Sequence, residues 1–131
     1  MSGWDAYITN LMQSSSVIKK AAIVAAADGS VWARSESPAF SATADELKSF
    51  VGLFERLDEV PRTGFDLEGV HYICPMTDEK LIFGRKAKTG VFAVKTNMTV
   101  VIACYEGETA DGLSCRSAVE KMGQYLAQSG Y

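Results

Sequence analysis

The segment from Phe65 to Tyr105 constrains the fold most, because short apolar stretches alternate there with turn-forming residues. Stretches rich in β-branched and aromatic residues occupy positions 70–74, 80–85, 91–95 and 99–105. They are separated by residues that favour tight turns, at positions 69, 78–79, 88–90 and 96–97. Connections this short join neighbouring strands that run in opposite directions. The segment therefore predicts a meander of antiparallel strands.

A further pair of strands is predicted near the N-terminus. Residues 17–26 form a run of alanine and β-branched residues, and Asp28 and Gly29 separate this run from residues 30–33. An Asp-Gly pair between two apolar runs favours a hairpin, because glycine accepts a positive φ angle. The many alanines of the first strand indicate close packing against another element, for which we expect a helix.

Three helices are predicted from apolar residues that recur with helical spacing. The first is expected at the N-terminus, where Ser2 can act as the N-cap and Asp5 lies in capping-box position. The second is expected to begin at Thr43, where Glu46 completes another capping box, and to stop before Pro61. A third is expected before Gly130. The three apolar stripes are Trp4, Tyr7, Ile8 and Leu11; Leu47, Phe50, Val51 and Phe54; and Ala118, Val119, Met122, Tyr125 and Leu126.

The order helix, hairpin, helix, strand meander, helix is that of an α+β protein. We expect a single domain over residues 1–131, built on a central antiparallel sheet with the terminal helices on one face and the middle helix elsewhere. The length of 131 residues and a hydrophobic content of 47% suffice for one buried core.

Composition and charge exclude several classes of function. The formal net charge is -3 and there is no extended basic block, so nucleic acid is not an expected partner. The N-terminus lacks the pattern of a signal peptide, and no apolar run approaches the roughly 20 residues that span a bilayer. The three cysteines show no C-x-x-C spacing and His71 is the single histidine, so we expect reduced thiols in the cytoplasm and no metal site.

No catalytic constellation is recognisable in the sequence. The chain lacks the G-x-S-x-G, G-x-x-x-x-G-K and H-E-x-x-H motifs. Residues 84–90 contain two glycines without phosphate-loop spacing, and a β-hairpin with a basic rim is the simpler interpretation. Cys115 lies near Asp111 in the sequence, but nothing connects it to His71, the one candidate base. We expect no enzyme and no cofactor; the competing hypothesis is a small-ligand sensor or enzyme with a deep cavity lined by His71 or a buried cysteine.

Five aromatic residues that carry a polar N–H or O–H group fall on the segments near the two ends of the chain and on an early strand: Trp4, Tyr7, Trp32, Tyr125 and Tyr131. Rings of this kind are often plain core. If the terminal helices lie side by side, the rings instead form a shallow groove. Such a groove suits polyproline II peptides, because prolines stack on aromatic faces while indole N–H and phenol O–H groups bind peptide carbonyls. The sequence is compatible with both interpretations.

Basic residues cluster on the strand meander, at Arg85, Lys86, Lys88 and Lys95. They form either a solvated hairpin rim or a local positive patch for an acidic protein surface or an anionic lipid headgroup. Glu120 and Lys121 on the last predicted helix are either rim charges of the same interface or exposed polar positions. Sequence spacing does not choose between these alternatives.

Separated segments, in the right order along the whole chain, resemble the profilin family. They are SGWDAYI at 2–8, AAIV at 21–24 leading to DGSVWA at 28–33, GRK at 84–86 with TGV at 89–91 and VKT at 94–96, and VEKMGQYL at 119–126. The resemblance implies a profilin-like central antiparallel β-sheet of the seven-stranded type. It also implies that the N- and C-terminal helices pack together on one face of the sheet and a further helix on the other.

The resemblance also implies two binding surfaces and a lipid ligand. Profilins bind proline-rich peptides between the terminal helices, a role that falls by position on Trp4, Tyr7, Trp32, Tyr125 and Tyr131. They bind monomeric actin through the later strands and the start of the last helix, and the matching positions are His71, Ile73, Arg85, Lys86, Lys95, Arg116, Glu120 and Lys121. They also bind phosphoinositide headgroups, for which the candidates are Arg85, Lys86 and Lys88.

Three departures from the family pattern bear on these expectations. Tyr125 stands where some members have a histidine, and it keeps a ring and a hydrogen-bonding tip. The tail at 127–130 lacks the basic pair of some animal members, which lowers the expected affinity for phosphoinositides. His71 and Met76 lie on a strand where other members have basic residues, which lowers the expected affinity for actin.

The sequence thus predicts a cytoplasmic, cytoskeleton-associated adaptor that binds monomeric actin, regulates its polymerisation and holds proline-rich proteins. The alternative is a peptide-binding module of the same fold with weak or lost actin binding. We expect a monomer, since nothing in the sequence demands a larger assembly.

Overall fold

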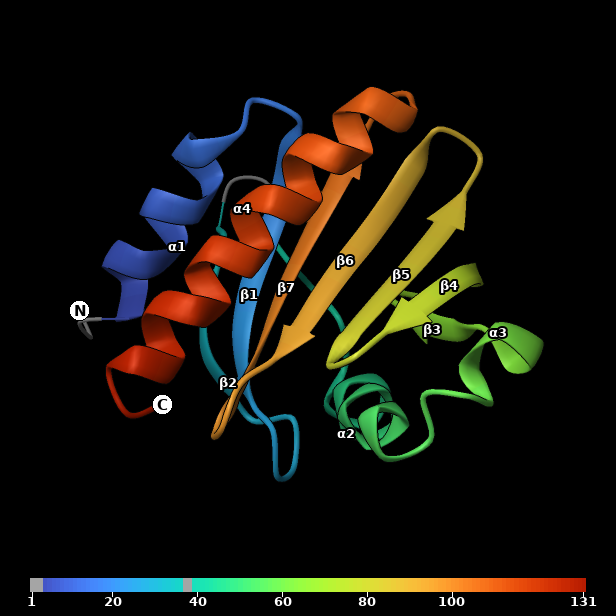
Figure 1. Ribbon diagram of the computed structural model, residues 1–131, viewed down its shortest axis with the longest axis horizontal. Coiled ribbons are helices and arrows are strands. Elements are labelled where there is room, and N and C mark those ends of the chain that lie inside the picture. Colours follow the sequence, from blue (N-terminus) through green and yellow to red (C-terminus); the bar gives the residue numbers. More distant parts are fainter. Residues whose placement is uncertain (1–3, 37–38) are drawn as a thin grey trace.

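In a computed structural model of the protein, residues 4–36 and 39–131 are described, and a seven-stranded antiparallel sheet runs through the molecule (Figure 1). The strand order is β2-β1-β7-β6-β5-β4-β3. The predicted meander and the predicted hairpin are thus joined into one sheet by the pairing of the first strand with the last. The strands are β1 (Ile18–Ala25), β2 (Val31–Arg34), β3 (Phe65–Leu67), β4 (Val70–Asp78), β5 (Leu81–Lys86), β6 (Thr89–Lys95) and β7 (Thr99–Glu106).

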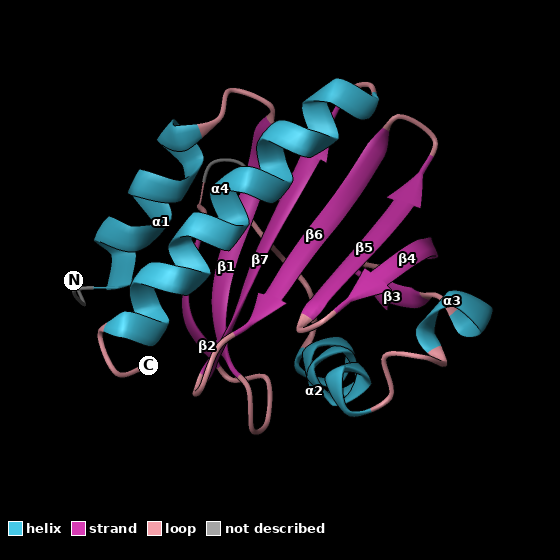
Figure 2. Ribbon diagram, viewed as in Figure 1, coloured by secondary structure: helices cyan, strands magenta, loops and turns pink. Residues whose placement is uncertain are grey.

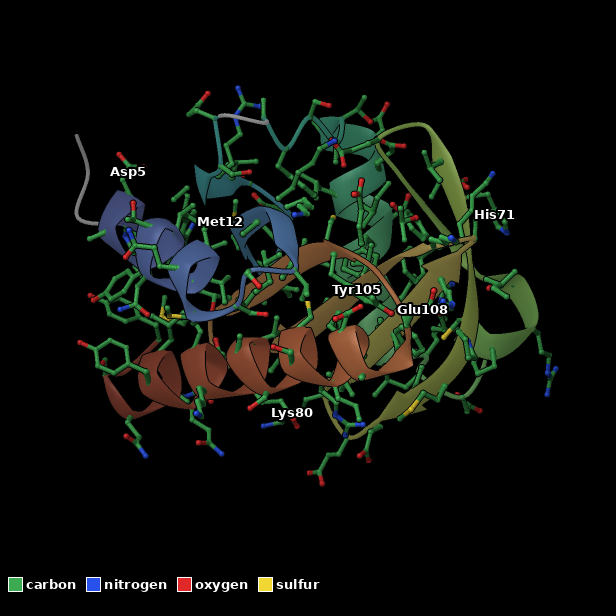
Figure 3. All side chains as sticks on the ribbon, turned by 90° about the horizontal axis from the view of Figure 1, so that it is seen from above. Asp5, Met12, His71, Lys80, Tyr105 and Glu108 are labelled. Atoms are coloured by element: carbon green, nitrogen blue, oxygen red, sulfur yellow. The ribbon has the colours of Figure 1, made fainter. Side chains whose placement is uncertain are left out.

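Helices cover both faces of the sheet (Figure 2). Helices α1 (Trp4–Ser14) and α4 (Thr109–Gln128) lie side by side on one face, as expected. Helix α2 (Ala44–Gly52), the 3₁₀ helix η1 (Leu53–Glu55) and the short helix α3 (Val60–Thr63) belong to the opposite side. Seen from above, the sheet lies between α4 and α2 (Figure 3). The predicted α+β arrangement is confirmed.

Strand alternation divides the core into two layers, because successive side chains of a strand point to opposite faces. In β1, Ala21 and Ile23 pack under α1 and α4, whereas Ala22 and Val24 pack against α2. All four side chains are fully buried, so small alanines allow helices to approach the strand from both sides. This confirms the expectation drawn from the alanine-rich run.

Helix α2 begins as predicted. The Thr43 hydroxyl accepts a hydrogen bond from the Glu46 N–H at 3.1 Å, and the Glu46 carboxylate accepts one from the Thr43 N–H at 2.9 Å. The same carboxylate accepts hydrogen bonds from the N–H groups of Glu68 and Gly69, at 3.0 and 2.8 Å. Glu46 therefore ties the start of α2 to the turn between β3 and β4. The expected cap of α1, Ser2, lies outside the described residues.

Several boundaries differ from those predicted. Pro61 does not mark a simple stop, because it lies in the first turn of α3, where the N–H that proline lacks would have no helical partner. The three-residue strand β3 was not predicted. Gly90 was expected in a turn but lies within β6, paired with Tyr105, and the turn is confined to Ala87 and Lys88. A Cβ atom at Gly90 would lie 2.5 Å from the Tyr105 ring, so a tight tertiary contact requires glycine in this strand.

Helices α1 and α4 run antiparallel to each other. The hydroxyl groups of Ser15 and Ser114 are 2.7 Å apart and join the end of α1 to the start of α4. At the other end of the seam the Tyr7 and Tyr125 rings meet, with centroids 5.7 Å apart. The two helices therefore share a seam with a polar end and an aromatic end.

Candidate functional site

The structure brings together all five aromatic residues that the sequence analysis selected. The Trp4 ring is central, with centroid distances of 5.2 Å to Tyr7, 4.9 Å to Trp32 and 4.8 Å to Tyr131. Tyr125 extends the cluster through its contact with Tyr7. We call these five residues the aromatic groove.

The aromatic groove is a surface feature and does not belong to the buried core. Tyr125 and Tyr131 are 52% and 37% exposed, and the other three rings are half-buried. The core side of α1 is supplied instead by Ile8 and Leu11, which are 5% and 1% exposed. The interpretation of the rings as plain core is therefore wrong.

The position of Tyr131 is determined by main-chain hydrogen bonds. Its N–H donates to the Leu126 carbonyl at 2.8 Å, and its main-chain oxygen accepts hydrogen bonds from the Met98 N–H and, at 2.9 Å, from the Thr96 hydroxyl. Thr96 is only 6% exposed and lies in the turn between β6 and β7. This turn therefore fixes the end of the chain beside Trp4 and Trp32. The sequence alone does not reveal this contact, because the residues involved are far apart in the chain.

The groove offers both aromatic faces and hydrogen-bonding groups. Burial raises the pKa of the Tyr7 hydroxyl, and a hydrogen bond with Tyr125 raises it further, so Tyr7 stays protonated and can donate. Two indoles and three phenols on a half-exposed surface match the needs of a polyproline II chain, whose prolines stack on rings and whose carbonyls need donors.

A second surface lies where β4 and β5 extend beyond the cover of α4 (Figure 1). Ile73 pairs with Arg85 across these strands, and Ile73 is 63% exposed. Leu113 at the start of α4 is 62% exposed. Leu113 lines a cavity of about 350 Å³, which is floored by Phe83, Phe92 and Tyr105 and flanked by Arg85 and Arg116. We call this region the strand surface.

A buried tyrosine fixes one arginine of the strand surface. The Arg85 guanidinium donates to the Tyr105 hydroxyl at 3.1 Å, and Tyr105 is 1% exposed beneath the first turns of α4 (Figure 3). Burial raises the pKa of Tyr105 although the nearby Arg85 opposes this shift, so the phenol remains neutral. A Cβ atom at Gly90 or Gly112 would lie 2.6 or 2.8 Å from this hydroxyl oxygen. Two glycines thus make room for the pair.

The comparison with known proteins decides the family. A sequence model described as Profilin matches residues 2–131. The chain belongs to the profilin family. Profilin-2 of Caenorhabditis elegans is 57% identical over 132 residues, which cover 100% of both chains. The solved structure of Acanthamoeba castellanii profilin IB is 32% identical, covers 98% of this chain and 100% of its own, and has a TM-score of 0.86.

Two more distant profilin structures share the fold and contain partners. Mouse profilin IIa in complex with a double repeat from the FH1 domain of mDia1 has a TM-score of 0.77 at 24% identity, covering 99% of this chain and 100% of the mouse chain. LokiProfilin2 in complex with rabbit actin has a TM-score of 0.72 at 18% identity, covering 95% of this chain and 98% of the other. At these identities the likeness concerns the profilin fold alone.

Two of the remaining residues expected at an actin surface, Arg116 and Glu120, lie beside the strand surface in ion pairs. Arg116 contacts Asp78 at 3.4 Å and Glu120 at 3.3 Å. Lys95 is 3.5 Å from Glu55 of η1, so its ammonium group lies on the side of the sheet opposite to α4 and away from the strand surface, although the residue also lines a hollow beside Glu120. Lys121 is different, because it lines the seam between α1 and α4 together with Tyr7 and Tyr125.

His71 lies towards the sheet edge, where its Nδ1 is 2.8 Å from the Asp66 carboxylate on β3. It is exposed on β4, on the same side of the strand as Ile73, because the intervening Tyr72 faces the opposite core. In the view of Figure 3, His71 lies at the far end of the molecule from Asp5 and Met12 of α1.

The three residues expected to bind phosphoinositides do not share one face. Arg85 and Lys86 are adjacent on β5, so their side chains point to opposite sides of the sheet. Arg85 turns towards Tyr105, whereas Lys86 and Lys88 are exposed at the end of β5 and in the turn that follows. A joint site of all three would require Arg85 to leave Tyr105.

The structure offers little support for metal or thiol chemistry. Within residues 4–36 and 39–131, no three His, Cys, Asp or Glu side chains group to hold a metal ion. The three cysteines are free and buried. Burial raises the pKa of Cys115 to about 12 and also raises that of Cys74 and Cys104, so the thiols stay protonated and unreactive. None of the described helices is long and apolar enough to cross a membrane.

Proposed function

We propose that this protein binds monomeric actin through the strand surface and proline-rich peptides through the aromatic groove, and thereby regulates actin polymerisation in the cytoplasm. It is a monomeric adaptor of one domain that acts by binding its partners and catalyses no reaction. The observation that carries the proposal is the assembly of five half-exposed aromatic rings on the seam of α1 and α4, on the far side of the molecule from the exposed face of β4 and β5.

Membership of the profilin family and two solved complexes support the choice of partners. A mouse profilin has been solved with an FH1 repeat, and another profilin of the same fold has been solved with actin. The groove here supplies the rings and donors that a proline-rich chain needs. The strand surface supplies exposed aliphatic residues, Ile73 and Leu113, rimmed by paired charges, which is the composition of a protein interface.

Separate surfaces allow both partners to bind at the same time. His71 lies at one end of the molecule and helix α1 at the other (Figure 3). A protein that holds actin at one end and a proline-rich segment at the other raises the local concentration of actin at the factor that carries the segment. The two surfaces together thus deliver actin to such a factor, which neither surface could do alone.

Calorimetric titration with monomeric actin and, separately, with a polyproline peptide tests the proposal. Trp4→Ala removes the central ring and an indole donor and is expected to weaken peptide binding by about 2 kcal/mol or more while actin binding is kept. Leu113→Asp is the reciprocal variant and is expected to weaken actin binding while sparing the peptide. Thermal unfolding of both variants shows whether the fold is intact.

The outcomes separate the leading hypothesis from its competitors. Equal loss of both ligands in either variant would argue against two independent surfaces. Binding of the peptide without actin would favour the peptide-binding module of the same fold. Phosphoinositide binding stays a prediction for Lys86 and Lys88, which are both exposed, and charge reversal at either should reduce binding to anionic vesicles.

A further inference from the structure

Arg85 differs from the other arginine of the strand surface in the group that holds it. Arg116 contacts two carboxylates, those of Asp78 and Glu120. Arg85 takes part in none of the ion pairs between described residues. Its Nη1 instead donates to the hydroxyl oxygen of Tyr105 at 3.1 Å. No carboxylate of the described residues therefore neutralises the positive charge of Arg85.

The hydroxyl group of Tyr105 lies in a space that the backbone leaves open for it. The ring of Tyr105 is buried and stacks on that of Phe92, with centroids 5.9 Å apart, beneath the first turns of α4 (Figure 3). A Cβ atom at Gly90 or Gly112 would lie 2.6 or 2.8 Å from the hydroxyl oxygen. The hydroxyl group is thus confined to one place, and it can hold the guanidinium that donates to it in one orientation.

A phenol holds an arginine without cancelling its charge. A carboxylate in the same place would form an ion pair with Arg85 and leave little charge for a partner. Burial raises the pKa of Tyr105 although Arg85 opposes the shift, so the phenol stays neutral. The nearby carboxylate of Asp111 is engaged within α4, where it accepts a hydrogen bond from the Glu108 N–H at 2.8 Å. Arg85 is thus fixed in place and keeps its full charge.

The guanidinium of Arg85 keeps donors available for a ligand. A guanidinium carries five N–H donors in one plane, and the bond to Tyr105 uses one of them. Two donors that lie side by side in this plane match the two oxygens of a carboxylate. The same arginine flanks the cavity of the strand surface, whose floor is aromatic.

The arrangement specifies the chemistry of the group that meets Arg85. An uncompensated cation beside an apolar cavity is matched by an acidic side chain next to an apolar one on the partner. The fit depends on the orientation of the guanidinium, because a bidentate bond requires the carboxylate and the guanidinium to share a plane. Whatever fixes this orientation therefore contributes to recognition.

We propose that Tyr105 is a positioning residue of the strand surface: its hydroxyl group orients the Arg85 guanidinium, which then binds a carboxylate of the partner through two N–H groups. This inference rests on the proposed binding of monomeric actin. Tyr105 is buried, so it acts through Arg85 and does not touch the partner. The inference also gives a function to the space that Gly90 and Gly112 leave beside the hydroxyl group.

Titration of monomeric actin with the variant Tyr105→Phe tests the inference. The variant keeps the ring and removes the hydroxyl group, so Arg85 retains its charge and loses its fixed orientation. Actin is expected to bind about fivefold more weakly, the effect of losing one hydrogen bond. Ile102→Val is the control for a loss of stability, because it shortens a fully buried side chain in the opposite core layer. The control should bind actin as the unaltered protein does.

Variants of Arg85 and nuclear magnetic resonance separate positioning from a merely structural role. Arg85→Gln should weaken actin binding about tenfold or more, and Tyr105→Phe added to it should cause no further loss, because the hydroxyl group acts only through the arginine. Arg85→Lys keeps the charge but should bind almost as weakly as Arg85→Gln, because an ammonium group lacks the planar fork. In the free protein the two NH₂ groups of Arg85 should give separate signals, which merge in Tyr105→Phe as the guanidinium rotates freely.

The outcomes distinguish failure of the positioning role from failure of the proposed function. If the unaltered protein binds actin and Tyr105→Phe binds it equally well, the positioning role is refuted and actin binding stands. A further loss from Tyr105→Phe in the Arg85→Gln background also refutes it, because the tyrosine then acts by another route. Full affinity in Arg85→Lys refutes recognition of a carboxylate through two N–H groups. If the unaltered protein does not bind actin at all, the proposed function fails and this inference fails with it.

Discussion

The hydroxyl group of Thr96 is expected to position Tyr131 for peptide binding. It donates to the main-chain oxygen of Tyr131 at 2.9 Å and lies in a side chain that is only 6% exposed. Thr96→Val keeps the shape of the side chain and removes this donor. Tyr131 then retains the Met98 N–H as its remaining partner at this oxygen. The ring of Tyr131 should lose its fixed place beside Trp4.

The expected losses of peptide affinity and of stability follow from the hydrogen bonds that Thr96→Val removes. One intramolecular hydrogen bond contributes about 0.5–1.5 kcal/mol net, so peptide affinity should fall by about twofold to tenfold if the loss acts wholly on the groove. Stability should fall as well, because the buried Thr99 N–H donates to the same hydroxyl at 3.1 Å. Leaving that donor without a partner costs about 1–3 kcal/mol.

Thr99→Val is the matched control. Thr99 is fully buried and its hydroxyl lies 2.5 Å from that of Thr96, but it makes no hydrogen bond to Tyr131. The control variant should therefore lose about 1 kcal/mol of stability and keep its peptide affinity. Calorimetric titration with polyproline, performed well below the unfolding temperature of both variants, compares the affinities; thermal unfolding compares the stabilities.

Two results would refute this reasoning. An unchanged peptide affinity in Thr96→Val, together with reduced stability, would show that Tyr131 is held without the hydroxyl. Equal weakening in both variants would show that the turn between β6 and β7 acts through general stability and not through Tyr131. Actin binding should be unaffected in both variants, since Thr96 and Thr99 are not among the residues that form the strand surface.

Two further predictions concern stability. Burial opposes ionisation of Glu46, but hydrogen bonds from three N–H groups lower its pKa below 4.5; Glu46→Gln should therefore reduce the free energy of unfolding by about 1–2 kcal/mol at pH 7. This difference should vanish as the pH falls through the lowered pKa, and a difference that persists in acid would contradict the assignment. Gly112→Ala places a Cβ atom 2.8 Å from the Tyr105 hydroxyl oxygen, so it should reduce the free energy of unfolding by about 1–3 kcal/mol and weaken actin binding. Gly52→Ala is the matched control, because its Cβ atom would meet no other atom within 4 Å, and it should be neutral or stabilising. Urea titration compares the stabilities of the two variants.

Local signals in the sequence determined most of the helices and strands, and they indicated which aromatic residues form the aromatic groove. The capping box of Thr43 and Glu46 starts a helix whatever surrounds it, because its hydrogen bonds join residues three positions apart. The spacing of Trp4 and Tyr7 places both rings on one face of α1 for the same local reason. Matches to the profilin pattern along the whole chain make the family recognisable from the sequence alone.

Only the tertiary structure decided which residues share a surface. Arg85 and Lys86 are neighbours in the chain but face opposite sides of the sheet, and Lys121 lies on the seam whereas Glu120 lies beside Arg116. The place of Gly90 in a strand depends on a ring contributed by Tyr105, fifteen positions later, and that of Tyr131 depends on the turn at Thr96. Such outcomes follow from packing between distant segments. Local propensity holds no information about packing of this kind, because the atoms involved meet only when the sheet and its helices have assembled.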